Sequence, residues 1–239
     1  MVAAEGAEHG VGGPVAEDSR GLRPPVVQDA YGPRPTWRGW LHFGAFLAVL
    51  PAGLYLLTVA ESTAARVAVA IYWASLAGLF ATSASYHRLA RTQRSVLWFR
   101  RADHSMIFVL IAGTYTPVCL IALPAMWGIP MLVVAWVTAL AGVILKMVRL
   151  GVAGKSSGSW LYIVMGWGAV ITLPVLVTSL NAMQLALLGI GGVLYTVGAV
   201  VLGRRRPDPV PDRFGYHEVW HSMTIVAGGC HFALVATLL

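Results

Sequence analysis

Residues 125–147 read AMWGIPMLVVAWVTALAGVILKM, and Lys146 is the only charged side chain among them. A helix that crosses a membrane needs roughly 20 consecutive apolar residues. This segment meets that length and carries its single charge next to one end, so we interpret it as a transmembrane helix.

Six further apolar runs of similar length surround this segment. The seven expected spans are residues 39–60, 65–87, 104–123, 125–147, 159–180, 182–203 and 216–238. Very short connections around Pro124 and Asn181 make the helices on either side antiparallel neighbours. The sequence therefore predicts an all-α membrane protein, a seven-transmembrane helix bundle that covers residues 37–239.

The composition of the 239 residues supports this class, because 57% are hydrophobic and only 11% are charged. A soluble domain carries about a quarter charged residues, so a soluble globule is excluded. Residues 1–36 differ from the rest of the chain, since they are rich in Gly, Pro and charge and lack any apolar period. We predict that they form a disordered cytoplasmic tail.

The basic residues predict the orientation of the bundle. Every Lys and Arg except Arg66 falls in the tail or beside the second, fourth and sixth connections between spans. By the positive-inside rule the N-terminus is cytoplasmic and the C-terminus lies outside, which explains the net charge of +7 without a nucleic-acid partner. The preference for Arg over Lys is typical of a GC-rich bacterial genome, so we expect a multi-pass protein of a bacterial plasma membrane. Cys119 and Cys230 lie in apolar runs and are expected to be packed thiols.

Ionisable side chains within the spans are the candidate functional residues, because charge inside a membrane is costly. His87 closes the second span, Asp103 opens the third, and His217 and His221 begin the last. With alternating helices these four groups share one membrane depth, near the cytoplasmic face. The topology was derived from Lys and Arg alone, so the shared depth of these four groups is independent of it. This agreement indicates a functional site.

The spacing of these residues predicts a metal centre. His217 and His221 are four residues apart and lie on one helix face, so both can reach a single ion, and His87 supplies a third nitrogen. Three protein ligands with an open position are typical of catalytic Zn²⁺. Ser83 lies one turn deeper than His87 on the same face, and Asp103 is placed to orient a water molecule or a ligand imidazole.

The remaining histidines receive more conventional interpretations. We expect His42 and His104 to be interfacial or hydrogen-bonded side chains. His231 lies some 20 Å from His217 along the helix, at about 1.5 Å per residue, and is expected to be a polar partner deep in the bundle.

The segment His217-Glu218-Val219-Trp220-His221 also has the form H-E-x-x-H, in which the Glu of a zinc protease is the general base. An intramembrane zinc protease is therefore an alternative. It is disfavoured because no later span follows to provide a third ligand, and because Glu218 lies about 100° around the helix from His217, towards the headgroups or an Arg.

Five motifs resemble the bacterial hemolysin III family: SASYH at 83–87, RADHS at 101–105, AGTYTP at 112–117, HEVWH at 217–221 and CHF at 230–232. This family is related to the adiponectin and progestin receptors and, more distantly, to the alkaline ceramidases. The resemblance covers residues 37–239.

The resemblance implies a seven-helix bundle with zinc held near the cytoplasmic face by His87, His217 and His221, and completed by Ser83 and Asp103. The best-studied relatives hydrolyse, or are proposed to hydrolyse, amide bonds of long-chain lipids. Two positions depart from the family pattern, since Ala102 replaces a frequent Leu and His104 stands where the receptor branch has Tyr. Neither change removes a ligand.

Two classes of function therefore remain open. The first is a zinc-dependent hydrolase of a lipid amide or ester bond, with Asp103 as general base or water orienter and Ser83 stabilising the oxyanion. The second is a non-enzymatic sensor, regulator or receptor-like protein of the membrane, in which structural zinc clamps the helices. An open fourth position favours the enzyme and a fourth protein ligand favours the clamp. A cytolytic function is suggested by the family name. It is disfavoured because no span carries a polar stripe suited to lining a wide channel. Membrane lipids are the expected partners.

Overall fold

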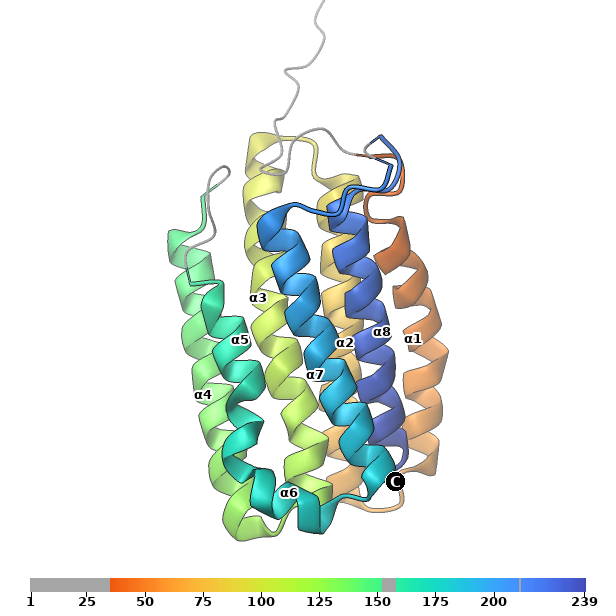
Figure 1. Ribbon diagram of the computed structural model, residues 1–239, viewed down its shortest axis with the longest axis vertical. Helices are drawn as coiled ribbons and strands as arrows, with labels where there is room; N and C mark the ends of the chain where they lie inside the picture. The colour runs from red at the N-terminus through yellow and green to blue at the C-terminus, as the bar shows by residue number, and fades with distance from the viewer. Residues whose placement is uncertain (1–34, 152–157, 211) are drawn as a thin grey trace, which may run out of the picture.

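The computed structural model describes residues 35–151, 158–210 and 212–239. Nearly all of the tail predicted for residues 1–36 lies outside these ranges, as does Lys155. The described chain contains seven helical spans that are long and apolar enough to cross a membrane, as predicted, and they stand side by side in Figure 1. The protein is thus an all-α, multi-pass membrane bundle.

Five of the spans are single helices, one ends in a π-helical turn, and one is broken in the middle. Their bounds are α1 Trp40–Val59, α2 Thr63–Leu89, α3 Gln93–Pro117 with the π-turn η1 Val118–Ala122, α4 Ala125–Arg149, α7 Ala182–Arg204 and α8 Tyr216–Ala236. The remaining span consists of α5 Trp160–Trp167, the 3₁₀ turn η2 Gly168–Thr172 and α6 Leu173–Ser179.

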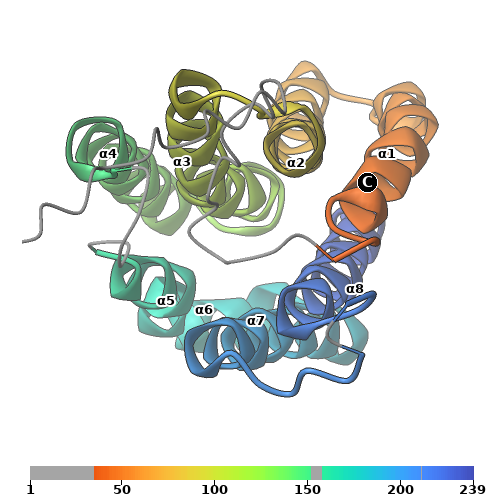
Figure 2. The same ribbon diagram turned by 90° about the horizontal axis from the view of Figure 1, so that it is seen from above.

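The spans are arranged as a ring in chain order, so that α1 returns to lie against α8 (Figure 2). Burial is uneven around this ring. About half of the α2 and α3 spans is buried (50% and 56%), and 39% of α8, against 17–22% in the other spans. The three helices that carry His87, Asp103, His217 and His221 are therefore the ones most shielded from lipid.

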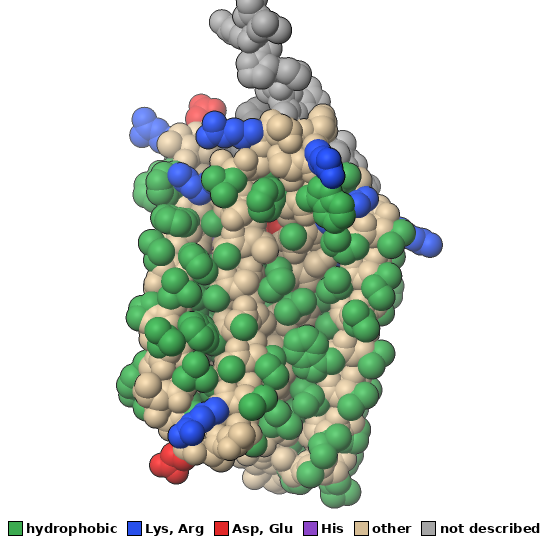
Figure 3. Space-filling view, turned by 180° about the vertical axis from the view of Figure 1, so that it is seen from behind, with side chains coloured by type: hydrophobic (Ala, Val, Ile, Leu, Met, Phe, Trp, Pro, Cys, Tyr) green, Lys and Arg blue, Asp and Glu red, His purple; other side chains and the backbone are tan. Residues whose placement is uncertain are grey.

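The outer surface is apolar over the length of the bundle, and the charged side chains gather near its ends (Figure 3). Large exposed hydrophobic side chains such as Leu47, Tyr55 and Val134 cover this surface, as expected where the solvent is hydrocarbon. Inside, Tyr72, Leu76 and their neighbours form an apolar core between α1, α2 and α8.

One predicted span was wrong at its start. The third helix begins at Gln93 rather than at residue 104, because Thr92 and Ser95 form a capping box there. Arg100 and Arg101 lie within α3, and their side chains donate hydrogen bonds to the backbone carbonyls of Gly151 and Leu150. Asp103 is therefore about three helical turns inside α3, whereas the sequence predicted that it opens this span.

The described basic residues gather at one end of the bundle with a single exception, as the sequence predicted. Arg66 lies at the opposite end of the bundle from the others, where its Nε donates to the carbonyl of Ala60 at 2.9 Å. Lys146 is an internal member of the basic set, since it is buried in α4 and its Nζ lies 5.0 Å from the centre of the Tyr162 ring. Cys119 and Cys230 are free thiols, as expected.

Candidate metal centre

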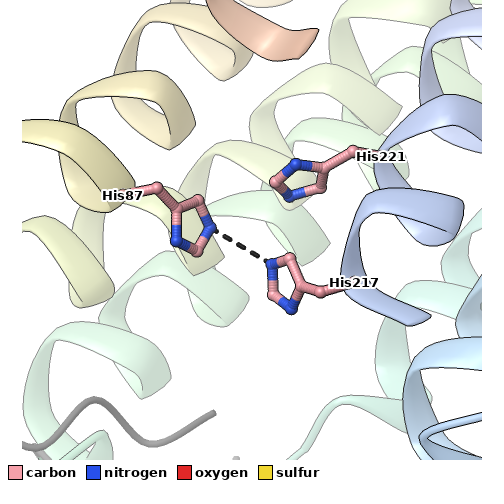
Figure 4. A group of neighbouring side chains, drawn as sticks. All are labelled: His87, His217 and His221. Carbon is pink, nitrogen blue, oxygen red and sulfur yellow. Dashed lines mark hydrogen bonds between the residues drawn. The ribbon is translucent and has the colours of Figure 1, made fainter. Parts of the chain in front are cut away.

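Three buried imidazoles converge where the end of α2 meets the beginning of α8. His87, His217 and His221 are each no more than 3% exposed, and one ligand nitrogen of each lies within 4.8 Å of the other two. The Nε2 atoms of His87 and His217 are 3.2 Å apart. Figure 4 shows the rings of His217 and His221 extending from one helix towards His87 on the other. The three nitrogens thus border one small space.

This arrangement follows from local sequence features on both sides. The spacing of four residues puts His217 and His221 one turn apart on α8. On the other side, Gly39 packs against α2, and a Cβ atom at this position would lie only 2.9 Å from the Cβ of His87. Gly39 also has a φ of +82°, a left-handed conformation that glycine adopts without steric cost. The chain ahead of α1 can therefore approach the histidines closely.

The geometry fits a zinc ion. With Zn–N distances of about 2.0–2.1 Å and tetrahedral angles, two ligand nitrogens are about 3.3 Å apart. The 3.2 Å between His87 and His217 agrees with this value. His221 has a buried Nδ1 atom without a hydrogen-bond partner in the described chain, and a polar atom buried without a partner is costly.

The group contains three candidate ligands and no more. Among the described residues, the group of His, Cys, Asp and Glu side chains that could hold one ion consists of these three histidines. A tetrahedral ion held by these imidazoles has one coordination position left for a ligand from outside the protein.

Ser83 and Asp103 lie at different places relative to the three histidines. Ser83 is buried on α2, one turn before His87 and on the same face. Asp103 is on α3, its side chain is 17% exposed, and its Oδ2 lies 3.8 Å from Nδ1 of His104. The structure therefore brings Asp103 beside His104 and does not place it among the candidate ligands.

Glu218 is held by two partners at the beginning of α8. Its Oε1 lies 2.5 Å from Nε of Arg38, and its Oε2 accepts a hydrogen bond of 2.9 Å from the backbone N–H of Gly215. Both side chains of the ion pair are at most 3% exposed. Because both carboxylate oxygens are engaged, Glu218 is poorly placed as the general base of a zinc protease, and it faces an Arg as one of the sequence alternatives proposed.

The sequence interpretation of His42 was wrong. This side chain is only 2% exposed, and neither ring nitrogen forms a hydrogen bond with the part of the chain that the structure describes. Its ring instead stacks on that of His221, with centroids 3.8 Å apart and an interplanar angle of 19°. The only sequence signal was the spacing of four residues between Arg38 and His42 at the beginning of the first span, on the side where the other histidines were expected.

His104 and His231 agree with their sequence interpretations. Nδ1 of His104 lies 2.9 Å from the carbonyl oxygen of Arg100, within hydrogen-bond distance. Nε2 of His231 lies 3.3 Å from the carbonyl oxygen of Leu188 on α7, deep in the bundle.

Comparison with known proteins identifies the relatives of this chain. Residues 31–232 match the family described as haemolysin-III related. The chain is 31% identical over 192 residues to the hemolysin-3 homolog of Bacillus subtilis (strain 168), which covers 79% of this chain and 86% of the relative. It is 35% identical over 190 residues to hemolysin-3 of Bacillus cereus, which covers 78% and 81%. The match to the family includes all three histidines of the site, and the chain belongs to the hemolysin III family.

Proposed function

We propose that this protein is a zinc-dependent hydrolase that cleaves an amide or ester bond of a membrane lipid, in the manner of a ceramidase. The observation that carries this proposal is the group of three buried imidazoles, with ligand nitrogens within 4.8 Å of one another and a zinc-like separation of 3.2 Å between two of them. The described residues add no fourth ligand to this group. An open position suits a catalytic ion, whereas a structural zinc site is usually closed by four protein ligands.

The donor set specifies the class of metal. His87, His217 and His221 offer neutral nitrogen ligands in a buried space, and imidazole suits a borderline-soft divalent ion such as Zn²⁺. A zinc ion held there supplies Lewis-acid chemistry at neutral pH, acting on a carbonyl group and on water. Proton transfer and stabilisation of the developing negative charge are the roles left to the side chains of the protein.

Two side chains are assigned to the proton and the developing negative charge. Asp103 is partly exposed and accepts a proton from the attacking water as general base. Ser83, on the same face of α2 as His87, donates a hydrogen bond to the substrate oxygen as negative charge develops on it. Both assignments require the substrate to enter between α2, α3 and α8.

The position of the site in the bundle favours a lipid substrate. The histidines lie near the end of the bundle where the basic side chains gather, while the rest of the outer surface is apolar. In a lipid, the amide or ester bond joins the headgroup to the acyl chain, which places it at the boundary between charge and hydrocarbon. The site and the bond therefore occur at the same membrane depth.

A second candidate function is a sensor or regulator of membrane lipids with structural zinc. It is favoured by the fact that the imidazoles come from α2 and α8, which are far apart in the chain, so that an ion between them would fix the last helix to the second. Two relatives carry the name hemolysin-3, but the apolar outer surface provides no argument for a cytolytic pore in this chain.

The test begins with metal analysis of the protein purified in detergent, for which we expect one zinc per chain. The zinc-loaded and the chelated protein are then incubated with ceramide and with ester lipids, and released fatty acid is measured. Release that depends on zinc supports the hydrolase. If no lipid is cleaved and zinc removal sharply lowers the melting temperature, the sensor with structural zinc replaces it.

A further inference from the structure

The beginning of α1 places two nitrogen-bearing side chains against the three histidines. His42 stacks on His221, and both of its ring nitrogens are buried without a hydrogen bond to the described chain. Arg38 is 4% exposed, and its Nη1 is likewise buried without a partner in the described ranges. The backbone of His221 also acts on the His42 ring, but neither ring nitrogen forms a hydrogen bond of normal geometry with the described chain.

These orphaned atoms call for a physical explanation. Most buried polar atoms in folded proteins are paired with protein or water, and each exception has a cost. Here three such atoms come from two side chains, Arg38 just ahead of α1 and His42 in its first turn, next to the candidate metal centre. Nη1 of Arg38 and the protonated ring nitrogen of a neutral His42 are both donors, so each needs an acceptor, which a bound ligand can provide.

The stacking of His42 on His221 excludes a role as a fourth metal ligand. The nitrogen lone pairs of an imidazole lie in the plane of its ring. Two nearly parallel rings 3.8 Å apart therefore direct their nitrogens side by side, and not at one ion about 2 Å from both. A nitrogen of His42 is better placed to contact a group that occupies the open coordination position next to His221.

Arg38 is oriented by Glu218. The carboxylate engages Nε of the guanidinium, which fixes its plane and leaves the Nη1 edge for another acceptor. A guanidinium presents its N–H groups in a rigid fork that matches an oxyanion, and its positive charge acts on the nearby His217 and His221. An anionic oxygen group is therefore the complementary ligand.

We propose that Arg38 and His42 form an oxyanion-binding site that holds the oxygen atoms of the ligand bound at the three-histidine centre. The chemical class is a carboxylate, or the negatively charged oxygen that develops when an acyl group is transferred. This inference rests on the proposed metal centre and goes beyond it, because it assigns ligand contacts to a segment that contributes no metal ligand.

The test uses cobalt, whose visible absorption reports the ligands of a tetrahedral site. The full-length protein in detergent is loaded with Co²⁺ and titrated with acetate. We expect His42→Phe, which keeps a ring for stacking but removes both nitrogens, to retain Co²⁺ and to weaken acetate binding about tenfold, as loss of a charge-assisted hydrogen bond does. Arg38→Lys keeps the charge but not the fork, and we expect a similar loss.

A complementary variant separates ligand binding from simple packing. His42→Gln loses the stacked ring but keeps an N–H donor, and we expect it to bind acetate more tightly than His42→Phe does. His231→Phe replaces a buried histidine elsewhere on α8 and is the matched control, for which acetate affinity stays unchanged.

The outcomes distinguish the two levels of the proposal. If the parent protein takes up no Co²⁺, the metal centre itself is refuted. If Co²⁺ binds but acetate affinity is the same in the parent, His42→Phe and Arg38→Lys proteins, the oxyanion site is refuted and the metal centre stands. Loss of Co²⁺ in His42→Phe, or better acetate binding by His42→Phe than by His42→Gln, also overturns the assignment.

Discussion

Nε of Arg38 lies 2.5 Å from Oε1 of Glu218, and this buried ion pair ties the segment ahead of the first helix to the beginning of the last. The same Glu218 caps α8 through the N–H of Gly215. One carboxylate thus fixes both the start of the helix that carries His217 and His221 and the approach of the chain to it.

Replacing Glu218 by Gln tests whether this residue is structural. Removing one charge of a buried pair leaves the other uncompensated and costs about 3–5 kcal/mol, so we expect a clearly lower melting temperature. Zinc content should remain near that of the parent, because all three imidazoles are retained. If Glu218→Gln instead leaves stability unchanged but abolishes hydrolysis of the substrate, Glu218 acts as a general base, as it would in a zinc protease.

Single substitutions of the histidines test the ligand set. His87→Ala, His217→Ala and His221→Ala are each expected to lose most of the bound zinc, measured by elemental analysis of the purified protein. His104→Ala is the control, because this buried histidine bonds to a backbone carbonyl outside the cluster. Stoichiometric zinc in the His217→Ala/His221→Ala double variant would refute the assignment.

Asp103→Asn separates the enzyme from the sensor. Asp103 lies inside α3 and is not its cap, so the change should leave helix content and zinc content nearly unchanged. An amide cannot accept the proton from water at neutral pH, so we expect lipid hydrolysis to be abolished. Activity equal to that of the parent would show that Asp103 has no acid–base role.

Gly39→Ala tests the close approach of the chain to α2. The new Cβ would lie 2.9 Å from that of His87, and the left-handed backbone costs a non-glycine residue about 1–2 kcal/mol. We expect a lower melting temperature and weaker zinc binding, measured by competition with a chelator. Gly44→Ala is the matched control on α1, because its Cβ would meet no atom within 4 Å, and it should change neither quantity.

Orientation is tested with reporters. A reporter fused after Leu239 should read as external, and one fused ahead of Arg38 as cytoplasmic, because the basic residues lie at the latter end. Both ends on the same side would contradict a bundle with an odd number of spans.

Hydropathy was sufficient to predict most of this fold because lipid demands a minimum apolar length. The span expected at 182–203 is observed at Ala182–Arg204, and the others agree similarly, with one exception. The start of α3 was missed because Arg94, Arg100 and Arg101 suggested a loop, whereas all three are helical. The side chains of Arg100 and Arg101 reach backbone carbonyls at the end of α4.

The candidate site was predictable only where it depends on helix geometry. The pairing of His217 with His221 follows from a spacing of four residues, and their meeting with His87 follows from membrane depth. The stacking of His42 on His221 depends on how α1 packs against α8, and the partner of Glu218 depends on the path of the chain ahead of α1. Neither is encoded in any local pattern.

The ring arrangement, in which the last helix returns to the first, determines when the site can exist during biosynthesis. His87 is made and inserted early, but His217 and His221 are separated from it by four intervening spans and reach the membrane with the final helix. A nascent chain still on the ribosome, or one truncated before Tyr216, carries a single imidazole of the three. Metal uptake therefore follows completion of the whole chain, and a site that holds its metal indicates that every span has been inserted.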